Sequence, residues 1–143
     1  MSSDPILIVP GEKESVFFEI FFKSLKSKFF LSPIILICDK KNLDKESKKY
    51  NFNKNIEQIK LDKIFSKKLH KKKIYVIDVR FQEPSEYVFD CFKVAFKLIK
   101  KGLTHKMING PINKTRTLKN KYLGVTEFVA KNFSQNQFAM LIY

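Results

Sequence analysis

The sequence predicts an α/β protein with a mainly parallel sheet and flanking helices. Short apolar runs alternate along the chain with longer segments whose apolar residues recur at helical spacing. The short runs are apolar throughout, as expected for strands that are buried on both faces of a parallel sheet. A chain of 143 residues with 44% apolar and 29% charged residues is globular in composition and long enough for one domain.

Six apolar segments are predicted to be strands. They are Pro5–Val9, Ser32–Cys38, Ile56–Leu61, Ile74–Val79, Lys106–Asn109 and Phe138–Tyr143. The dipeptides Pro10-Gly11 and Gly110-Pro111, both typical of turns, close the first and the fifth of them. The sixth would end the chain on an apolar strand that no helix covers. We therefore expect residues 1–143 to be the truncated, N-terminal part of a single larger α/β domain.

Four segments are predicted to be helical. Ser15–Phe30 is apolar nearly all round, which indicates a buried helix, and Lys40–Tyr50 is a polar one. The clearest helix is Pro84–Lys101, where apolar residues recur every three or four positions, proline occupies the first turn and Gly102 follows the end. A fourth helix is expected to start near Thr126.

The charge of the chain is strongly positive, with 28 basic and 14 acidic residues and a net charge of +14. Such a balance is typical of proteins that bind nucleic acids or anionic surfaces. All the basic residues except Arg80 and Arg116 are lysines, however, and base recognition relies on the guanidinium fork of arginine. We therefore expect most lysines, including the run Lys67–Lys73, to lie on solvated surfaces. A basic nucleic-acid-binding domain is kept as an alternative, although a nucleic-acid partner is not expected.

The sequence shows no sign of a membrane or secretory protein. Its longest uncharged apolar stretch, Phe29–Cys38, has ten residues, whereas a bilayer span needs about 20. The first residues do not have the pattern of a signal peptide. Cys38 and Cys91 each lie within an apolar run and predict no disulfide framework, so we expect a cytoplasmic protein with no membrane partner.

Three loops are candidates for a ligand site, because ligands of open α/β sheets lie beyond the carboxyl ends of the strands. They are Pro10–Glu12, Gly110–Lys114 and Gly124–Phe128, and they contain three of the four glycines. Lys114 or the hydroxyl of Thr126 could hold a phosphate. The alternatives are ordinary turns, an N-cap role for Thr126 and a solvated Lys114.

Other candidate residues have weaker patterns around them. His70 and His105 have no second ligand at metal spacing, and both are expected on the surface. Cys38 and Cys91 are expected to be small core residues, and Asp78 is either functional or a turn residue. The sequence thus identifies neither a catalytic residue nor a metal ligand.

Taken in order, the three loops resemble the 4-hydroxythreonine-4-phosphate dehydrogenase family of vitamin B6 biosynthesis. The segment Ile8–Glu12, followed by Glu19-Ile20, is similar to the family's opening I-T-P-G-[DE]-P-A-G-I-G-P-E-I at equal spacing. Asn109–Lys114 (NGPINK) resembles its T-A-P-I-N-K segment. Gly124–Ala130 (GVTEFVA) resembles its G-H-T-E-F-L-A segment.

The resemblance implies a fold like that of isocitrate and isopropylmalate dehydrogenases. It further implies an NAD-dependent oxidation of 4-phosphooxy-L-threonine, followed by loss of carbon dioxide. A divalent metal (zinc, magnesium or cobalt) polarises the substrate hydroxyl in this family, and the enzymes are homodimers. The metal ligands and most of the NAD site are expected downstream of Tyr143, so the chain alone is expected to be inactive. A related enzyme acting on a four-carbon sugar-acid phosphate is the alternative within this fold.

The same resemblance assigns substrate contacts to Thr126 and to position 125, and Lys114 stays a candidate contact because of its charge and its loop. Val125 stands where the family has the histidine of its G-H-T-E-F segment, so this polar contact is either lost or supplied from elsewhere. In the opening loop, Ser15, Phe17 and Phe18 stand where the family has Gly, Gly and Pro. If those glycines have positive φ, the loop must follow a different backbone path here.

Overall fold

The computed structural model of the protein describes residues 4–27, 30–134 and 139. The chain divides into two compact units, Met1–Pro111 and Ile112–Tyr143. The first unit holds a five-stranded sheet and three helices, and the described part of the second holds one helix.

The sheet of the first unit is parallel throughout, as the continuous apolar runs predict. Its order is β3-β4-β2-β1-β5, and the strands are β1 (Ile6–Val9), β2 (Ile34–Cys38), β3 (Ile56–Gln58), β4 (Ile74–Asp78) and β5 (Met107–Asn109). Five of the predicted strands are thus confirmed. The sixth, Phe138–Tyr143, lies outside the described residues except for Ala139.

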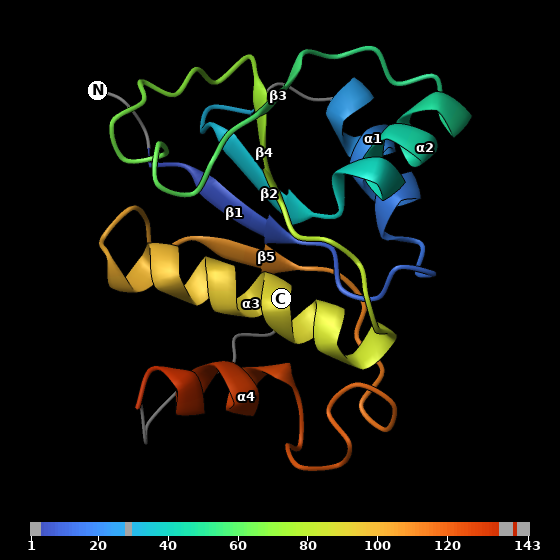
Figure 1. Ribbon diagram of the computed structural model, residues 1–143, viewed down its shortest axis with the longest axis vertical. Helices are drawn as coiled ribbons and strands as arrows, with labels where there is room; N and C mark the ends of the chain where they lie inside the picture. Colours follow the sequence, from blue (N-terminus) through green and yellow to red (C-terminus); the bar gives the residue numbers. More distant parts are fainter. Residues whose placement is uncertain (1–3, 28–29, 135–138, 140–143) are drawn as a thin grey trace. The chain divides into compact units, whose positions relative to one another are not determined.

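Helices cover both faces of this sheet (Figure 1). The helices α1 (Phe17–Ser27) and α2 (Lys40–Lys49) lie on one face, and α3 (Pro84–Lys100) lies on the other. The fourth helix, α4 (Val125–Asn132), belongs to the second unit. All four helices lie where the sequence predicts them. None of the helices in the described part of the chain is long and apolar enough to cross a membrane.

Alternate residues of the strands supply the two layers of the core, because successive side chains of a strand point to opposite faces. On the α1 face, buried residues of the sheet and helices form one apolar cluster that includes Ile8, Phe18, Phe22, Leu36 and Val76. The expectation that α1 is buried nearly all round is wrong. Ile20 is 56% exposed, since α1 packs against the sheet along one side only.

The strand order reverses at the β1–β5 pair. The chain passes from β1 to its neighbour β2 and, after β4, returns through α3 to the other side of β1 as β5. Val9 and Asn109, the last residues of these two strands, lie opposite one another in the register. In open α/β sheets, ligands bind beyond the carboxyl ends of the strands at such a reversal. The fold therefore directs attention to the loops that follow β1 and β5.

Candidate functional site

The loops after β1 and β5 pack tightly against each other. The backbone N–H of Gly110 donates to the carbonyl of Val9 at 2.7 Å, and that of Glu12 donates to the carbonyl of Pro111 at 3.1 Å. A Cβ atom added to Gly110 would lie 1.9 Å from the carbonyl oxygen of Pro10. The structure thus brings the first predicted loop, Pro10–Glu12, into contact with Gly110 and Pro111 of the second. Glycine is needed at position 110 because no room exists there for a side chain.

The opening loop then enters α1 on an ordinary backbone. The only described non-glycine residues with positive φ lie elsewhere in the chain, so Ser15, Phe17 and Phe18 are unstrained. The Ser15 hydroxyl accepts a hydrogen bond from the Phe17 N–H at 3.3 Å, near the start of the helix. Phe17 and Phe18 are buried in the core. At the positions where the resembling family has Gly, Gly and Pro, this chain therefore has one side chain that hydrogen-bonds near the start of the helix and two that pack in the core.

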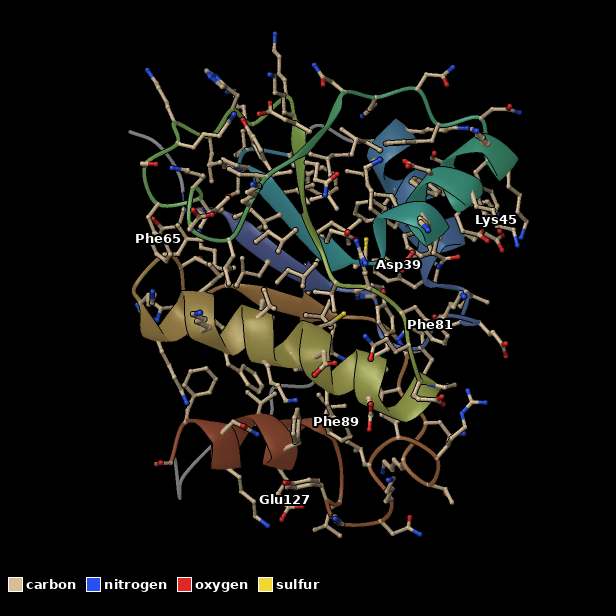
Figure 2. All side chains as sticks on the ribbon, viewed as in Figure 1. Asp39, Lys45, Phe65, Phe81, Phe89 and Glu127 are labelled. Carbon is tan, nitrogen blue, oxygen red and sulfur yellow. The ribbon has the colours of Figure 1, made fainter. Side chains whose placement is uncertain are left out.

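Two carboxylates lie at the carboxyl ends of the neighbouring strands β2 and β4. Asp39, which is labelled in Figure 2, caps α2 by accepting the Asn42 N–H at 2.7 Å, and its second oxygen accepts the Phe81 N–H at 2.9 Å. Asp78 accepts the N–H of Lys40 at 2.8 Å. Of the two roles predicted for Asp78, the structure thus supports a structural one at the strand end. Sequence reasoning missed Asp39, although an aspartate directly before a helix is a standard N-cap signal.

A buried group of polar side chains lies behind these carboxylates. The Tyr87 hydroxyl accepts a hydrogen bond from the Asp39 N–H at 2.9 Å. Burial raises the pKa of the Tyr87 hydroxyl, raises the pKa of the Cys91 thiol to about 12 and raises that of Cys38 well above its ordinary value. Both cysteines are therefore neutral core residues at physiological pH, as predicted, and neither is poised as a nucleophile.

In the second unit, Lys114 lies beside the start of α4. A Cβ atom built on Gly124, the residue that precedes this helix, would lie 4.0 Å from Cε of Lys114. The backbone around Lys114 is held by a hydrogen bond from the Arg116 N–H to the Asn113 side chain at 2.9 Å. Lys114 is exposed and forms no ion pair with a described residue. The structure thus brings two of the predicted site segments together within this unit.

The first turn of α4 leaves polar groups available for a ligand. Gly124 occupies the N-cap position and has no side chain to satisfy the first N–H groups of the helix. Thr126 is the second helical residue, so the alternative that Thr126 is itself the N-cap is wrong. No hydrogen bond from its half-buried hydroxyl to another described residue is present. Val125, the first helical residue, adds an apolar side chain at this point.

Glu127 closes the same turn. Its carboxylate accepts the Leu123 N–H at 2.6 Å and pairs with Lys131 at 3.3 Å. The hydrogen bond from Leu123, with help from Lys131, holds the pKa of Glu127 below its ordinary value. Glu127 is therefore ionised and engaged by Leu123 and Lys131, and the groups of this turn that attract an anion are the first N–H groups of α4 and the nearby ammonium of Lys114.

No metal centre is formed by the residues that the structure describes. They contain no group of three or more His, Cys, Asp or Glu side chains able to hold an ion. His70 and His105 are both exposed, as expected from the sequence. The Asp39 and Asp78 carboxylates, which come closest to a pair at the strand ends, are already engaged by backbone N–H groups.

Comparison with known proteins points to one family. The model of a family described as "Pyridoxal phosphate biosynthetic protein PdxA" matches residues 30–143. This range contains the second and third loop motifs and leaves out the opening one. A search of curated proteins by sequence found no match.

Solved structures share the fold of the chain. A 4-hydroxythreonine-4-phosphate dehydrogenase from Klebsiella pneumoniae superposes with a TM-score of 0.77 at 22% identity, over 99% of this chain and 47% of that one. The corresponding enzyme from Burkholderia phymatum gives 0.75 at 22% identity, over 94% and 44%. A Salmonella typhimurium protein provisionally assigned the same activity gives 0.77 at 22% identity, over 99% and 48%. The chain thus spans about half the length of the structures that it matches, and it shares their α/β fold.

Proposed function

We propose, because this chain belongs to the PdxA family of pyridoxal phosphate biosynthetic proteins, that it supplies part of the substrate site of a 4-hydroxythreonine-4-phosphate dehydrogenase. The observation that carries the proposal is the approach of Lys114 to the first turn of α4. Both segments lie within the residues that match the family model. They are also the two segments whose sequences resemble the family's motifs most closely.

The proposed contacts follow from the chemistry of a phosphorylated hydroxy amino acid. The ammonium of Lys114 and the open N–H groups at the start of α4 suit a phosphate or carboxylate oxygen. The Thr126 hydroxyl can donate to, or accept from, a polar substrate atom in the same turn. Val125 contributes shape and apolar contact only, since a valine side chain neither hydrogen-bonds nor titrates. The substrate-binding residues of the proposal are therefore Lys114, Thr126 and Val125.

NAD and a divalent metal ion (zinc, magnesium or cobalt) are part of the proposed activity, together with decarboxylation of the oxidised product. The described residues do not fit a metal site, because the strand-end carboxylates are engaged and no histidine accompanies them. We therefore assign no step of the reaction to a metal held by these residues. A homodimer and a cytoplasmic location complete the proposal.

The proposal is tested by titrating 4-phosphooxy-L-threonine into the chain in a calorimeter. Replacing Lys114 with alanine is expected to weaken binding about tenfold, because one charge-assisted hydrogen bond is lost. Lys121→Ala serves as the matched control, since it removes an equal charge from an exposed position of the same unit. If the two variants bind equally well, or if the unmodified chain does not bind the substrate, the assigned contact is wrong.

Position 125 offers a second test that also distinguishes the two candidate substrates. Val125→His restores the side chain that the resembling family has at this position and adds a hydrogen-bonding group to the first turn of α4. Tighter binding of 4-phosphooxy-L-threonine by this variant is the expected result. If instead the unmodified chain prefers a four-carbon sugar-acid phosphate, and the histidine removes that preference, the substrate is the alternative one.

A further inference from the structure

A hollow lies at the end of the sheet where the strands begin. It encloses about 560 Å³, a size typical of small-molecule sites. Ile34 and Ile74, the first residues of β2 and β4, form part of its wall. Leu25 from α1 and the following residues Phe30 and Leu31 complete an apolar lining. None of the residues proposed to bind the substrate lines this hollow.

Lysines form the rim of this hollow. Lys54, Lys71, Lys72 and Lys73 line it together with Asn55. A smaller neighbouring hollow of about 460 Å³ shares Asn55 and the last three of these lysines, and adds His70. No aspartate or glutamate lines either hollow. The charged side chains that line the two hollows are therefore all lysines, beside the polar Asn55 and His70 and an apolar wall.

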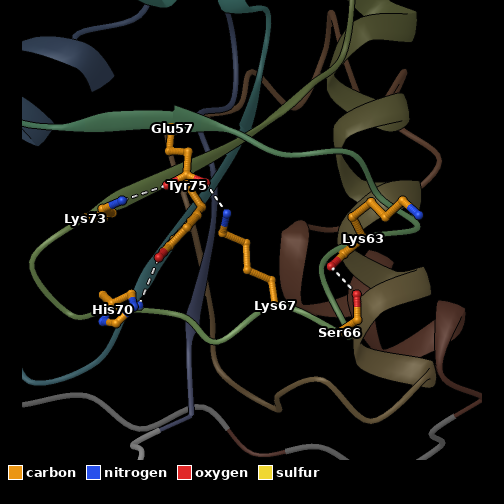
Figure 3. Close-up of polar contacts among 7 residues, drawn as sticks. All are labelled: Glu57, Lys63, Ser66, Lys67, His70, Lys73 and Tyr75. Atoms are coloured by element: carbon orange, nitrogen blue, oxygen red, sulfur yellow. Dashed lines mark hydrogen bonds and ion pairs between the residues drawn. The ribbon is translucent and has the colours of Figure 1, made fainter.

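The charges of this rim are only partly balanced by acidic residues. Glu57 pairs with Lys73 at 3.0 Å and also with Lys67, as Figure 3 shows, and both lysines lower the pKa of its carboxyl. Lys71 and Lys72 are exposed and form no ion pair with any described residue. The rim thus keeps at least two positive charges without a partner.

The segment that carries these lysines is held in place. The hydroxyl of the fully buried Tyr75 accepts the backbone N–H of His70 at 3.0 Å (Figure 3). The backbone N–H of Lys73 in turn donates to the carbonyl of His70 at 3.0 Å. The backbone of the turn over residues 70–73 is therefore anchored to β4 through Tyr75 and closed by its own hydrogen bond, which reduces the cost of ordering this backbone on binding.

We propose that this hollow binds a small amphiphilic anion, with an alkyl or aryl body and a carboxylate head. The apolar body lies against the half-buried Phe30 and the exposed Leu31, while the head lies between the ammonium groups of Lys71 and Lys72. Apolar lining with a few well-placed polar groups is the usual composition of such sites. The site uses part of the lysine run Lys67–Lys73 that the proposed dehydrogenase function leaves unexplained.

Decanoate is the probe for this proposal, and its binding to the full chain is measured by calorimetry. The double variant Lys71→Ala/Lys72→Ala is expected to bind decanoate about tenfold more weakly. Leu31→Ser, at a position that is 78% exposed, is expected to weaken binding without affecting folding. The control Lys45→Ala/Lys48→Ala removes the same charge from exposed positions of α2 and is expected to bind as the unmodified chain does.

Two further ligands separate the contributions of head and body. Decyltrimethylammonium has the same tail and the opposite charge, and acetate has the same head without the tail. Both are expected to bind much more weakly than decanoate. The proposal is overturned if decanoate does not bind, if either of these ligands binds as tightly as decanoate, or if the control pair weakens binding as much as the rim pair does.

Discussion

Replacing Gly110 with alanine should separate the loops after β1 and β5. The added methyl carbon would lie 1.9 Å from the carbonyl oxygen of Pro10, 2.6 Å from its carbonyl carbon and 2.8 Å from the ring of Phe17. The two closest atoms belong to the backbone, so they cannot rotate away as the end of a side chain could. Relief of this clash requires the two loops to move apart, and it also threatens the hydrogen bond from Gly110 to Val9.

The size of the effect follows from these two losses. Forcing a methyl group into a packed site costs about 1–3 kcal/mol, and a lost hydrogen bond adds about 1 kcal/mol. We therefore expect the free energy of unfolding of the first unit to fall by about 3 kcal/mol. For a unit of this length, the fall corresponds to a Tm lower by roughly 10 °C. Urea denaturation followed by far-UV circular dichroism measures the change.

Gly102→Ala is the matched control for this prediction. Gly102 has a φ of +78°, and no atom lies within 4 Å of an added Cβ. Alanine there meets only the cost of the left-handed backbone conformation, about 1–2 kcal/mol. If Gly102→Ala destabilises the chain as much as Gly110→Ala does, steric contact between the two loops does not explain the need for glycine at position 110.

Three further predictions concern the hydrogen bonds and the thiols. Asp39→Ala removes the N-cap of α2 and should lower the free energy of unfolding by about 1–2 kcal/mol in the same urea assay; an unchanged midpoint would contradict this. The thiols of Cys38 and Cys91 should resist labelling by a disulfide reagent at pH 8 in the folded chain and react once urea unfolds it, because burial raises the pKa of each; fast labelling of the folded chain would argue against it. Glu127 has a lowered pKa in the folded state, so its contribution to the stability of α4 is complete above the ordinary value of 4.5 and is lost as the pH falls through the lower folded value. The helix signal in circular dichroism should therefore differ between Glu127→Gln and the unmodified chain at pH 7, and this difference should vanish in acid. A difference that grows on acidification would contradict the prediction.

The residue pattern alone was enough to predict most of the fold. Continuous apolar runs predicted strands buried on both faces. The recurrence of apolar residues every three or four positions in Pro84–Lys101 predicted α3 to within one residue of its observed end. These features depend on local chemistry, namely which residues must leave water and which conformations Pro and Gly allow. The loop motifs also pointed to Lys114 and Thr126, because both lie in segments that resemble a known family.

Only the tertiary structure decided which residues meet and which of their polar groups are already in use. Whether α1 is buried all round depended on its packing against one face of the sheet, which leaves Ile20 exposed. The N-cap role of Asp39 is local, but its bond from Phe81 and the bond of Asp78 from Lys40 depended on backbone N–H groups about 40 residues away, which no local pattern reveals. The need for glycine at position 110 likewise follows from the parallel pairing of β1 with β5, since that pairing places Pro10 where a side chain would be. Contacts between distant segments are set by the topology of the sheet, and for that reason they could not be deduced from spacing along the chain.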